Sequence, residues 1–99
     1  MNVALFREEF PSTFEAMAAT LDRAVNVLRA RELISPEEVP CTRLCLEEAL
    51  VNAIRHGNQC DATRMVSLEV LGNGECCTIR VRDEGAGFSP EAVALPECD

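Results

Sequence analysis

Apolar residues recur every three or four positions over two long stretches of the chain, which is the spacing of one face of an α-helix. The first stretch predicts an amphipathic helix over residues 13–31, with these apolar positions: Phe14, Met17, Ala18, Leu21, Val25 and Leu28. Ser12 or Thr13 is a candidate N-cap, and Glu15 follows Ser12 at the spacing of a capping box. This region therefore contains its own helix start signal.

The second stretch predicts a helix that begins near Ser35 and ends near Gly57. Ser35 is a suitable cap, Pro36 fits the first helical position, and glutamates follow in the first turn. Glycine commonly ends a helix because it adopts a left-handed conformation without strain. The positions expected to face the core are Leu46, Leu50, Ala53 and Ile54.

Alternating residues predict strands in the remainder of the chain. An extended segment begins near Val3 and is broken at Phe10-Pro11. A strand over 65–71 places Val66, Leu68 and Val70 on one side, Gly72-Asn73-Gly74 is a hairpin signal, and a returning strand covers 76–81. Residues 83–88 read as a loop, and Ser89-Pro90-Glu91 reads as the start of another helix. The pattern predicts one α+β domain over residues 1–99, with helices on one face of a mostly antiparallel sheet.

Composition narrows the function classes. The chain has 99 residues and a net charge of −8, which argues against nucleic-acid binding because phosphate contacts need a basic surface. There is no apolar run of membrane-spanning length and no signal-peptide pattern at the start, so we expect a cytoplasmic protein without membrane contact. Six cysteines occur without a C-x-x-C pair. We interpret them as reduced, small apolar side chains, with a metal site at Cys41, Cys45 and His56 as the alternative.

Polar residues recur every four positions on the second predicted helix, opposite its apolar side. Glu48, Asn52 and His56 share this face, with Arg55 beside them. The stripe is either ordinary solvated surface or a site. Asn is unusual in mid-helix because its side chain competes for backbone hydrogen bonds, which draws attention to its position one turn from a carboxylate.

A glycine-rich segment follows the last predicted strand. Asp83 comes directly after that strand, and Gly85 and Gly87 allow the backbone to approach a flat ligand. A carboxylate here can accept a hydrogen bond from the exocyclic amine of a base. The alternative is a surface turn, since Asp and Gly are common turn residues.

The two segments together resemble a known superfamily. Leu46-Glu-Glu-Ala-Leu-Val-Asn-Ala-Ile-Arg-His-Gly-Asn58 resembles the N box of the GHKL (Bergerat-fold) ATPases, which include DNA gyrase, heat-shock chaperone ATPases, sensor histidine kinases and mismatch-repair ATPases. Val81-Arg-Asp-Glu-Gly-Ala-Gly-Phe88 resembles their first glycine box. The Glu-x-x-x-Asn form is most similar to the anti-sigma-factor serine kinase branch. The resemblance to the superfamily implies a two-layer α/β sandwich of the Bergerat type.

The resemblance implies roles for the candidate residues. Glu48 would be the general base for a partner serine hydroxyl, and Asn52 would hold the Mg²⁺ that bridges the phosphates of ATP. Asp83 would accept the adenine amino group, while Gly85 and Gly87 would let the loop pass close to the base. The implied partners are a sigma factor and its anti-sigma-factor antagonist, with a homodimer as a further expectation.

Three other functions stay open at this stage. The same fold could be a non-catalytic protein-binding module, a sensor histidine kinase domain or a thiol-based metal protein. The chain also departs from the family pattern, because no glycine follows Gly87 to form the second glycine box, and the lid and last strands are missing. We therefore expect either a truncated form or a short form that pairs with another copy, with weak or absent kinase activity in these residues alone.

Overall fold

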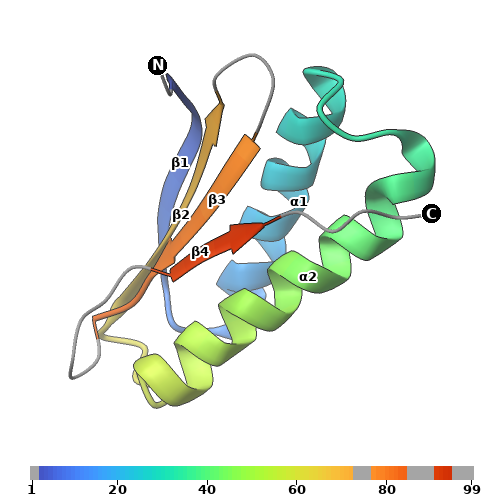
Figure 1. The fold of residues 1–99 in the computed structure, drawn as a ribbon. Helices are drawn as coiled ribbons and strands as arrows, with labels where there is room; N and C mark the ends of the chain where they lie inside the picture. Colours follow the sequence, from blue (N-terminus) through green and yellow to red (C-terminus); the bar gives the residue numbers. More distant parts are fainter. Residues whose placement is uncertain (1–2, 73–76, 85–90, 95–99) are drawn as a thin grey trace.

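The structure, a computed structural model, describes residues 3–72, 77–84 and 91–94. The described elements include two long helices and four strands (Figure 1). In chain order, the described elements are β1 (Val3–Pro11), α1 (Phe14–Ala30), the 3₁₀ helix η1 (Pro36–Glu38), α2 (Val39–Asn52), the π-helical turn η2 (Ala53–Gly57), β2 (Met65–Gly72), β3 (Cys77–Arg82) and β4 (Glu91–Ala94).

The described strands form one antiparallel sheet in the order β1-β2-β3-β4. The predicted helix start at Ser89-Pro90-Glu91 is wrong at Glu91, which begins β4 and pairs with Val81 of β3. Ser89 and Pro90 lie outside the described residues, as do Asn73 and Gly74 of the predicted hairpin turn and Cys76 at the predicted start of the returning strand. The α+β prediction with a mostly antiparallel sheet is confirmed.

β1 lies at one edge of the described sheet and includes both Phe10 and Pro11, where the sequence predicted a break. Phe10 and Pro11 pair with Val66 and Met65 at the start of β2. Proline is tolerated here because a strand at the edge of a sheet needs no second set of ladder hydrogen bonds. Ser12 then turns the chain into α1.

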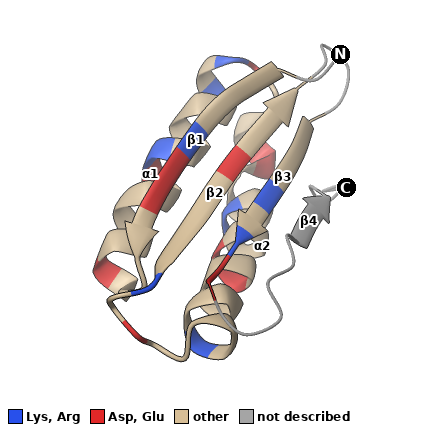
Figure 2. Cartoon of the chain, turned by 90° about the vertical axis from the view of Figure 1, so that its left-hand side faces the viewer, with Lys and Arg blue, Asp and Glu red and all other residues tan. Residues whose placement is uncertain are grey.

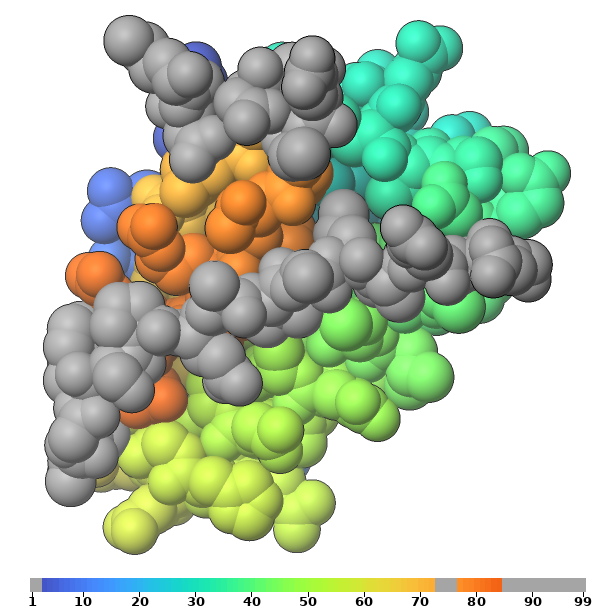
Figure 3. Space-filling view, in the orientation of Figure 1, coloured from blue at the N-terminus to red at the C-terminus, as the bar shows by residue number. Residues whose placement is uncertain are grey.

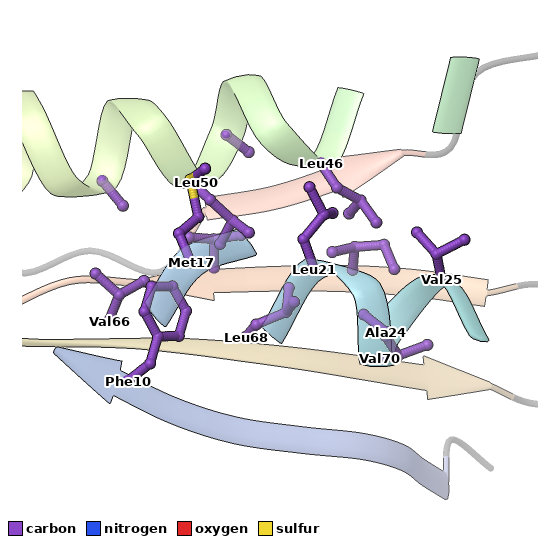
Figure 4. Packing of buried hydrophobic residues seen from close by; sticks show 14 of the residues in the cluster. Phe10, Met17, Leu21, Ala24, Val25, Leu46, Leu50, Val66, Leu68 and Val70 are labelled. Carbon is purple, nitrogen blue, oxygen red and sulfur yellow. The ribbon is translucent and has the colours of Figure 1, made fainter. Parts of the chain in front are cut away.

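The hydrophobic core lies between the sheet and the two helices, which cover the same face (Figures 1 and 4). Val66, Leu68 and Val70 point into it from β2, as their alternation predicts, and all three are fully buried. The helices contribute Met17, Leu21, Ala24, Val25 and Leu28 from α1 and Leu46, Ala49 and Leu50 from α2. This packing fixes which face of α2 is left for function.

The opposite face of the sheet carries alternating charges (Figure 2). Glu69 of β2 lies between Arg7 of β1, at 4.0 Å, and Arg80 of β3, at 3.4 Å. Both arginines are substantially exposed, and exposed ion pairs contribute little to stability. The two faces thus separate as expected for a sheet covered by helices on one side.

The helix boundaries follow from local hydrogen bonds. Thr13 is the N-cap of α1, and its hydroxyl oxygen accepts from the N–H of Ala16. At the other end, the N–H groups of Glu32 and Leu33 donate to the carbonyls of Arg29 and Leu28, which is a Schellman motif. Glu32 adopts φ = 56° there, a conformation that favours glycine.

The start of the second helical segment is also fixed by its own side chain. The backbone N–H of Ser35 donates to Oε1 of Glu38 at 2.8 Å, and Pro36 occupies the first position. This hydrogen bond from Ser35 lowers the pKa of Glu38. The predicted start near Ser35 is confirmed, although the first turn is a 3₁₀ helix.

The cysteines divide into two groups among the described residues. Cys77 is half-buried against the core, and burial raises the pKa of its thiol. Cys41 and Cys60 are exposed, so the interpretation as small apolar side chains does not fit them. Cys41, Cys60 and Cys77 are free thiols.

Candidate functional site

The exposed side of α2 borders a hollow of about 430 Å³. Glu48 and Asn52 line it together, one helical turn apart, with Leu44, Glu47 and Val51. The sequence prediction that Glu48 and Asn52 share a face is confirmed. Glu47, which the helical spacing places about 100° around the axis from Glu48, also borders the hollow.

The orientation of Glu48 and Asn52 follows from the packing of α2. Leu46 and Leu50 are fully buried against the sheet and α1, as predicted. Residues two positions from these leucines point to the opposite side of a helix, so Glu48 and Asn52 are exposed. The core therefore determines which side chains face the hollow.

After Asn52 the helix widens into the single π-helical turn η2. The N–H of Asn58 donates to the carbonyl of Ala53 at 2.8 Å, five residues earlier. Short π-helical turns are uncommon and frequently occur at functional sites. The turn brings Gly57 to the sheet side of the helix end and directs Asn58 into the interior, where it is 0% exposed.

Asp83, directly after β3, reaches this helix end. A Cβ atom built on Gly57 would overlap Cγ and Oδ2 of Asp83 and lie 2.8 Å from Oδ1. The Asp83 carboxylate thus occupies the space that a side chain at position 57 would fill. In Figure 3 the last residues of β3, in dark orange, lie beside the yellow-green turn that follows α2.

Asn58 is a structural residue that the sequence interpretation missed. Its Nδ2 group donates to Oγ of Ser12 at 2.8 Å and to the carbonyl of Met65 at 3.0 Å. Its Oδ1 atom accepts from the N–H of Glu84 at 2.8 Å. One buried amide therefore joins the end of η2 to the ends of three strands, next to Asp83.

Asn58 could have been noticed as an asparagine just after a helix-ending glycine. Asparagine is common at such helix ends for local reasons, however, and nothing in the sequence distinguishes a local cap from a long-range hub. The partners Ser12 and Glu84 are 46 and 26 residues away. Only the folded chain shows that they meet.

Among the described residues that line the two hollows, Asp83 is separate from Glu48 and Asn52. Asp83 borders a second hollow of about 340 Å³ with Glu9, Met65, Ser67, Arg82 and Glu84. Asn52 and Gly57 are five residues apart, a separation of about 7 Å along a helix axis. Gly85 and Gly87 lie outside the described residues.

His56 is exposed on η2, and the described lining of both hollows does not include it. The π-helical turn after Asn52 removes the strict four-residue spacing on which the predicted polar stripe depends. Of the predicted polar stripe, Glu48 and Asn52 border the hollow on α2, and His56 is not among its described lining residues.

A metal site in a protein usually gathers several His, Cys, Asp or Glu side chains. Within ranges 3–72, 77–84 and 91–94, no group of three or more His, Cys, Asp or Glu side chains could hold one. Mg²⁺ differs from zinc because it keeps several waters and takes most of its other ligands from substrate phosphates. The exposed amide oxygen of Asn52 fits this requirement, since it offers one hard ligand at an open surface.

The fold and this arrangement define an α+β domain with a carboxylate and an amide on a helix and a second carboxylate at its end. A sequence model described as a histidine kinase-like ATPase domain matches residues 10–99. The chain belongs to this family, which confirms the superfamily expected from the two sequence boxes. Membership of a kinase-like ATPase family implies that the domain binds ATP.

One further comparison and one structural finding accompany this assignment. A search of curated proteins finds no match to the chain. In the part of the chain that the structure describes, no helix is both long enough and apolar enough to cross a membrane. The assignment therefore rests on the family match and the site.

Proposed function

We propose that this domain binds Mg²⁺ and ATP at the exposed side of α2 and the adjoining end of β3, and is a serine kinase of the anti-sigma-factor type. The observation that carries the proposal is that Glu48 and Asn52 share one hollow, while Asp83 rests against the end of the same helical segment. A nucleotide has its phosphates at one end and its base at the other, so the phosphates would lie at Glu48 and Asn52 and the base at Asp83.

Asp83 is the proposed contact to adenine. Its carboxylate is held at the helix end beside Gly57 and is half-buried. A carboxylate accepts a hydrogen bond from the exocyclic amino group of adenine, whereas guanine presents a carbonyl oxygen at the corresponding position. This contact would favour ATP over GTP.

Asn52 is the proposed protein ligand of Mg²⁺. Its amide oxygen would contribute one ligand, with the phosphates and water supplying the others. Bound Mg²⁺ neutralises charge on the phosphates, which matters because phosphoryl transfer depends on positioning and electrostatic stabilisation. Asn52 thereby orients the phosphate end of ATP toward Glu48, one turn earlier.

Glu48 is the proposed general base. As the oxygen of the partner's serine attacks the γ-phosphorus, the hydroxyl proton passes to the carboxylate and ADP leaves. The exposure of Glu48 suits this role, since the serine arrives on another protein. That protein is the proposed anti-sigma-factor antagonist, and a sigma factor is the second proposed partner.

A calorimetric titration with Mg-ATP and Mg-GTP tests the nucleotide site. The wild type should prefer ATP, and Asp83→Asn should lose that preference because an amide presents a donor or a weaker acceptor to the adenine amine. Glu48→Gln should bind ATP as the wild type does. Equal affinity of the wild type for the two nucleotides would refute the adenine role of Asp83.

Transfer of γ-³²P to the antagonist separates a kinase from a binding protein. We expect Glu48→Gln to abolish this transfer, because the carboxylate that accepts the serine proton is lost. Glu37→Gln, which changes an exposed carboxylate outside the described lining of this hollow, is the control and should retain transfer. Equal transfer by wild type and Glu48→Gln would remove Glu48 from the mechanism.

A non-catalytic protein-binding role is the second candidate. Leu44 is 59% exposed and borders the same hollow as Glu48. Large exposed apolar side chains beside a concave surface are typical of protein contacts. In that case the antagonist would bind equally well with and without ATP, and Leu44→Ser would weaken binding while Glu48→Gln would not.

A further inference from the structure

Gly57 and Asp83 are packed so closely that no side chain fits between them. The atoms that a methyl group at position 57 would meet are the carboxylate atoms of Asp83, which are the end of a side chain and not backbone. We expect a methyl group there to push the carboxylate aside. The absence of a side chain at Gly57 therefore allows the Asp83 carboxylate to lie against the helix end.

The backbone beside Asp83 is held from a second direction by Asn58. Oδ1 of Asn58 accepts from the N–H of Glu84, the residue that follows Asp83. Nδ2 of Asn58 is anchored on Ser12 and on the carbonyl of Met65. The amide is fully buried, so its orientation is set by these three bonds and water does not compete for them.

We infer that Gly57 and Asn58 are positioning residues that set adenine specificity, because one clears the space for the Asp83 carboxylate and the other fixes the backbone that carries it. This inference rests on the proposed function, in which Asp83 contacts the base. It extends that function to two residues that touch neither the base nor the phosphates. The π-helical turn places both at the helix end together.

The inference separates specificity from stability. In Gly57→Ala the methyl group should displace the carboxylate and not the backbone, so the variant should still fold and unfold cooperatively in urea. The variant should nevertheless lose discrimination between ATP and purine riboside triphosphate, which lacks the exocyclic amine. A hydrogen bond to a charged group accounts for roughly a 10- to 100-fold preference, and this is the expected loss.

The readout is the ratio of the two dissociation constants, measured by calorimetry on the full chain with Mg²⁺ present. Wild type, Asp83→Asn, Gly57→Ala and the double variant are compared. Because Gly57 acts only through Asp83, the double variant should discriminate no less than Asp83→Asn alone. Ile34→Val, a conservative core change, is the stability control and should keep wild-type discrimination.

Variants at the Asn58 contacts provide an independent series. Ser12→Ala removes one acceptor of Nδ2 and keeps the Oδ1 bond to the Glu84 N–H, whereas Asn58→Ala removes all three bonds. Discrimination should fall in the order wild type, Ser12→Ala, Asn58→Ala. If Asn58→Ala fails to fold, equal discrimination by the wild type and Ser12→Ala would still contradict the role of Asn58.

The outcomes distinguish the inference from the function on which it depends. If Asp83→Asn keeps full discrimination, the proposed adenine contact fails. If Asp83→Asn loses discrimination but Gly57→Ala keeps it, the adenine contact stands and the inference is overturned. A Gly57→Ala chain that fails to fold also overturns it, because the methyl group would then displace more than a carboxylate.

Discussion

The buried amide of Asn58 makes a quantitative prediction about stability. Replacement by alanine removes three hydrogen bonds at once, two donated and one accepted. The hydroxyl of Ser12 keeps its own bond to the carbonyl of Arg64, at 2.7 Å. The carbonyl of Met65 and the N–H of Glu84 lose the bonds that Asn58 makes.

The expected cost follows from these two groups. A buried polar group left without its partner costs about 1–3 kcal/mol. Glu84 is exposed, so water partly compensates its N–H, and we expect the lower half of the range for that group. The sum is about 3 kcal/mol, which is a large part of the roughly 5–15 kcal/mol that stabilises a domain of this size.

Urea unfolding followed by far-ultraviolet circular dichroism measures this cost, since the chain has no Trp and no Tyr for fluorescence. With a slope of about 2 kcal/mol per molar urea, Asn58→Ala should lower the midpoint by about 1.5 M. Asn26→Ala removes an exposed asparagine from α1 and should shift stability by less than about 0.5 kcal/mol. Equal midpoints for the two variants would refute the role of Asn58 as a hub.

Three other predictions follow from single contacts. Glu32→Gly should stabilise the chain by about 1 kcal/mol, because residue 32 has a left-handed φ at the end of α1; a lower urea midpoint would contradict this. Thr42→Val should be stabilising by about 1 kcal/mol, because the Thr42 hydroxyl is buried and has no partner among the described residues. Thr63→Val is its control and should be destabilising, since the Thr63 hydroxyl bonds to Asp61 at 2.6 Å. The pKa of Glu38 is lowered in the folded state, so the ionised carboxylate stabilises the fold. This stabilisation should be fully present above the pKa of Glu38 in the unfolded chain, and it should be lost as the pH falls through the pKa of Glu38 in the folded chain. Glu38→Gln should flatten this part of the stability–pH curve in urea titrations, and an unchanged curve would exclude the Ser35–Glu38 contact as its cause.

Local patterns predicted most of the architecture. The 13–31 helix prediction differs from α1 by one residue at each end, because the Thr13 cap and the apolar spacing are encoded within the segment itself. The alternation of Val66, Leu68 and Val70 likewise predicted their burial. Such signals depend only on near neighbours, so a single sequence contains them.

The features that were missed depend on distant residues. Glu91–Ala94 forms β4 because it pairs with β3, while its own composition and the preceding Ser-Pro favour a helix start. Asn58 is a hub because Ser12, Met65 and Glu84 converge on it. Neither pairing leaves a periodic signal in the sequence.

Only the part of the candidate site that depends on local spacing could be predicted from the residues themselves. Glu48 and Asn52 share a hollow because helical spacing determines their face. Asp83 was linked to them by resemblance alone, and its contact with Gly57 arises from the way β3 packs against the helix end. The π-helical turn that makes this contact possible has no sequence signature that we recognised.

Nuclear magnetic resonance of the ¹⁵N-labelled chain with ATP tests whether one nucleotide touches both ends of the site. With Mn²⁺ in place of Mg²⁺, signals of residues near the metal are broadened, and we expect this most strongly at Glu48 and Asn52. With Mg-ATP, the Asp83 signal should shift at the same ligand concentration, and with purine riboside triphosphate this shift should shrink. Broadening at Asn52 without any response at Asp83, or the reverse, would contradict a single nucleotide site.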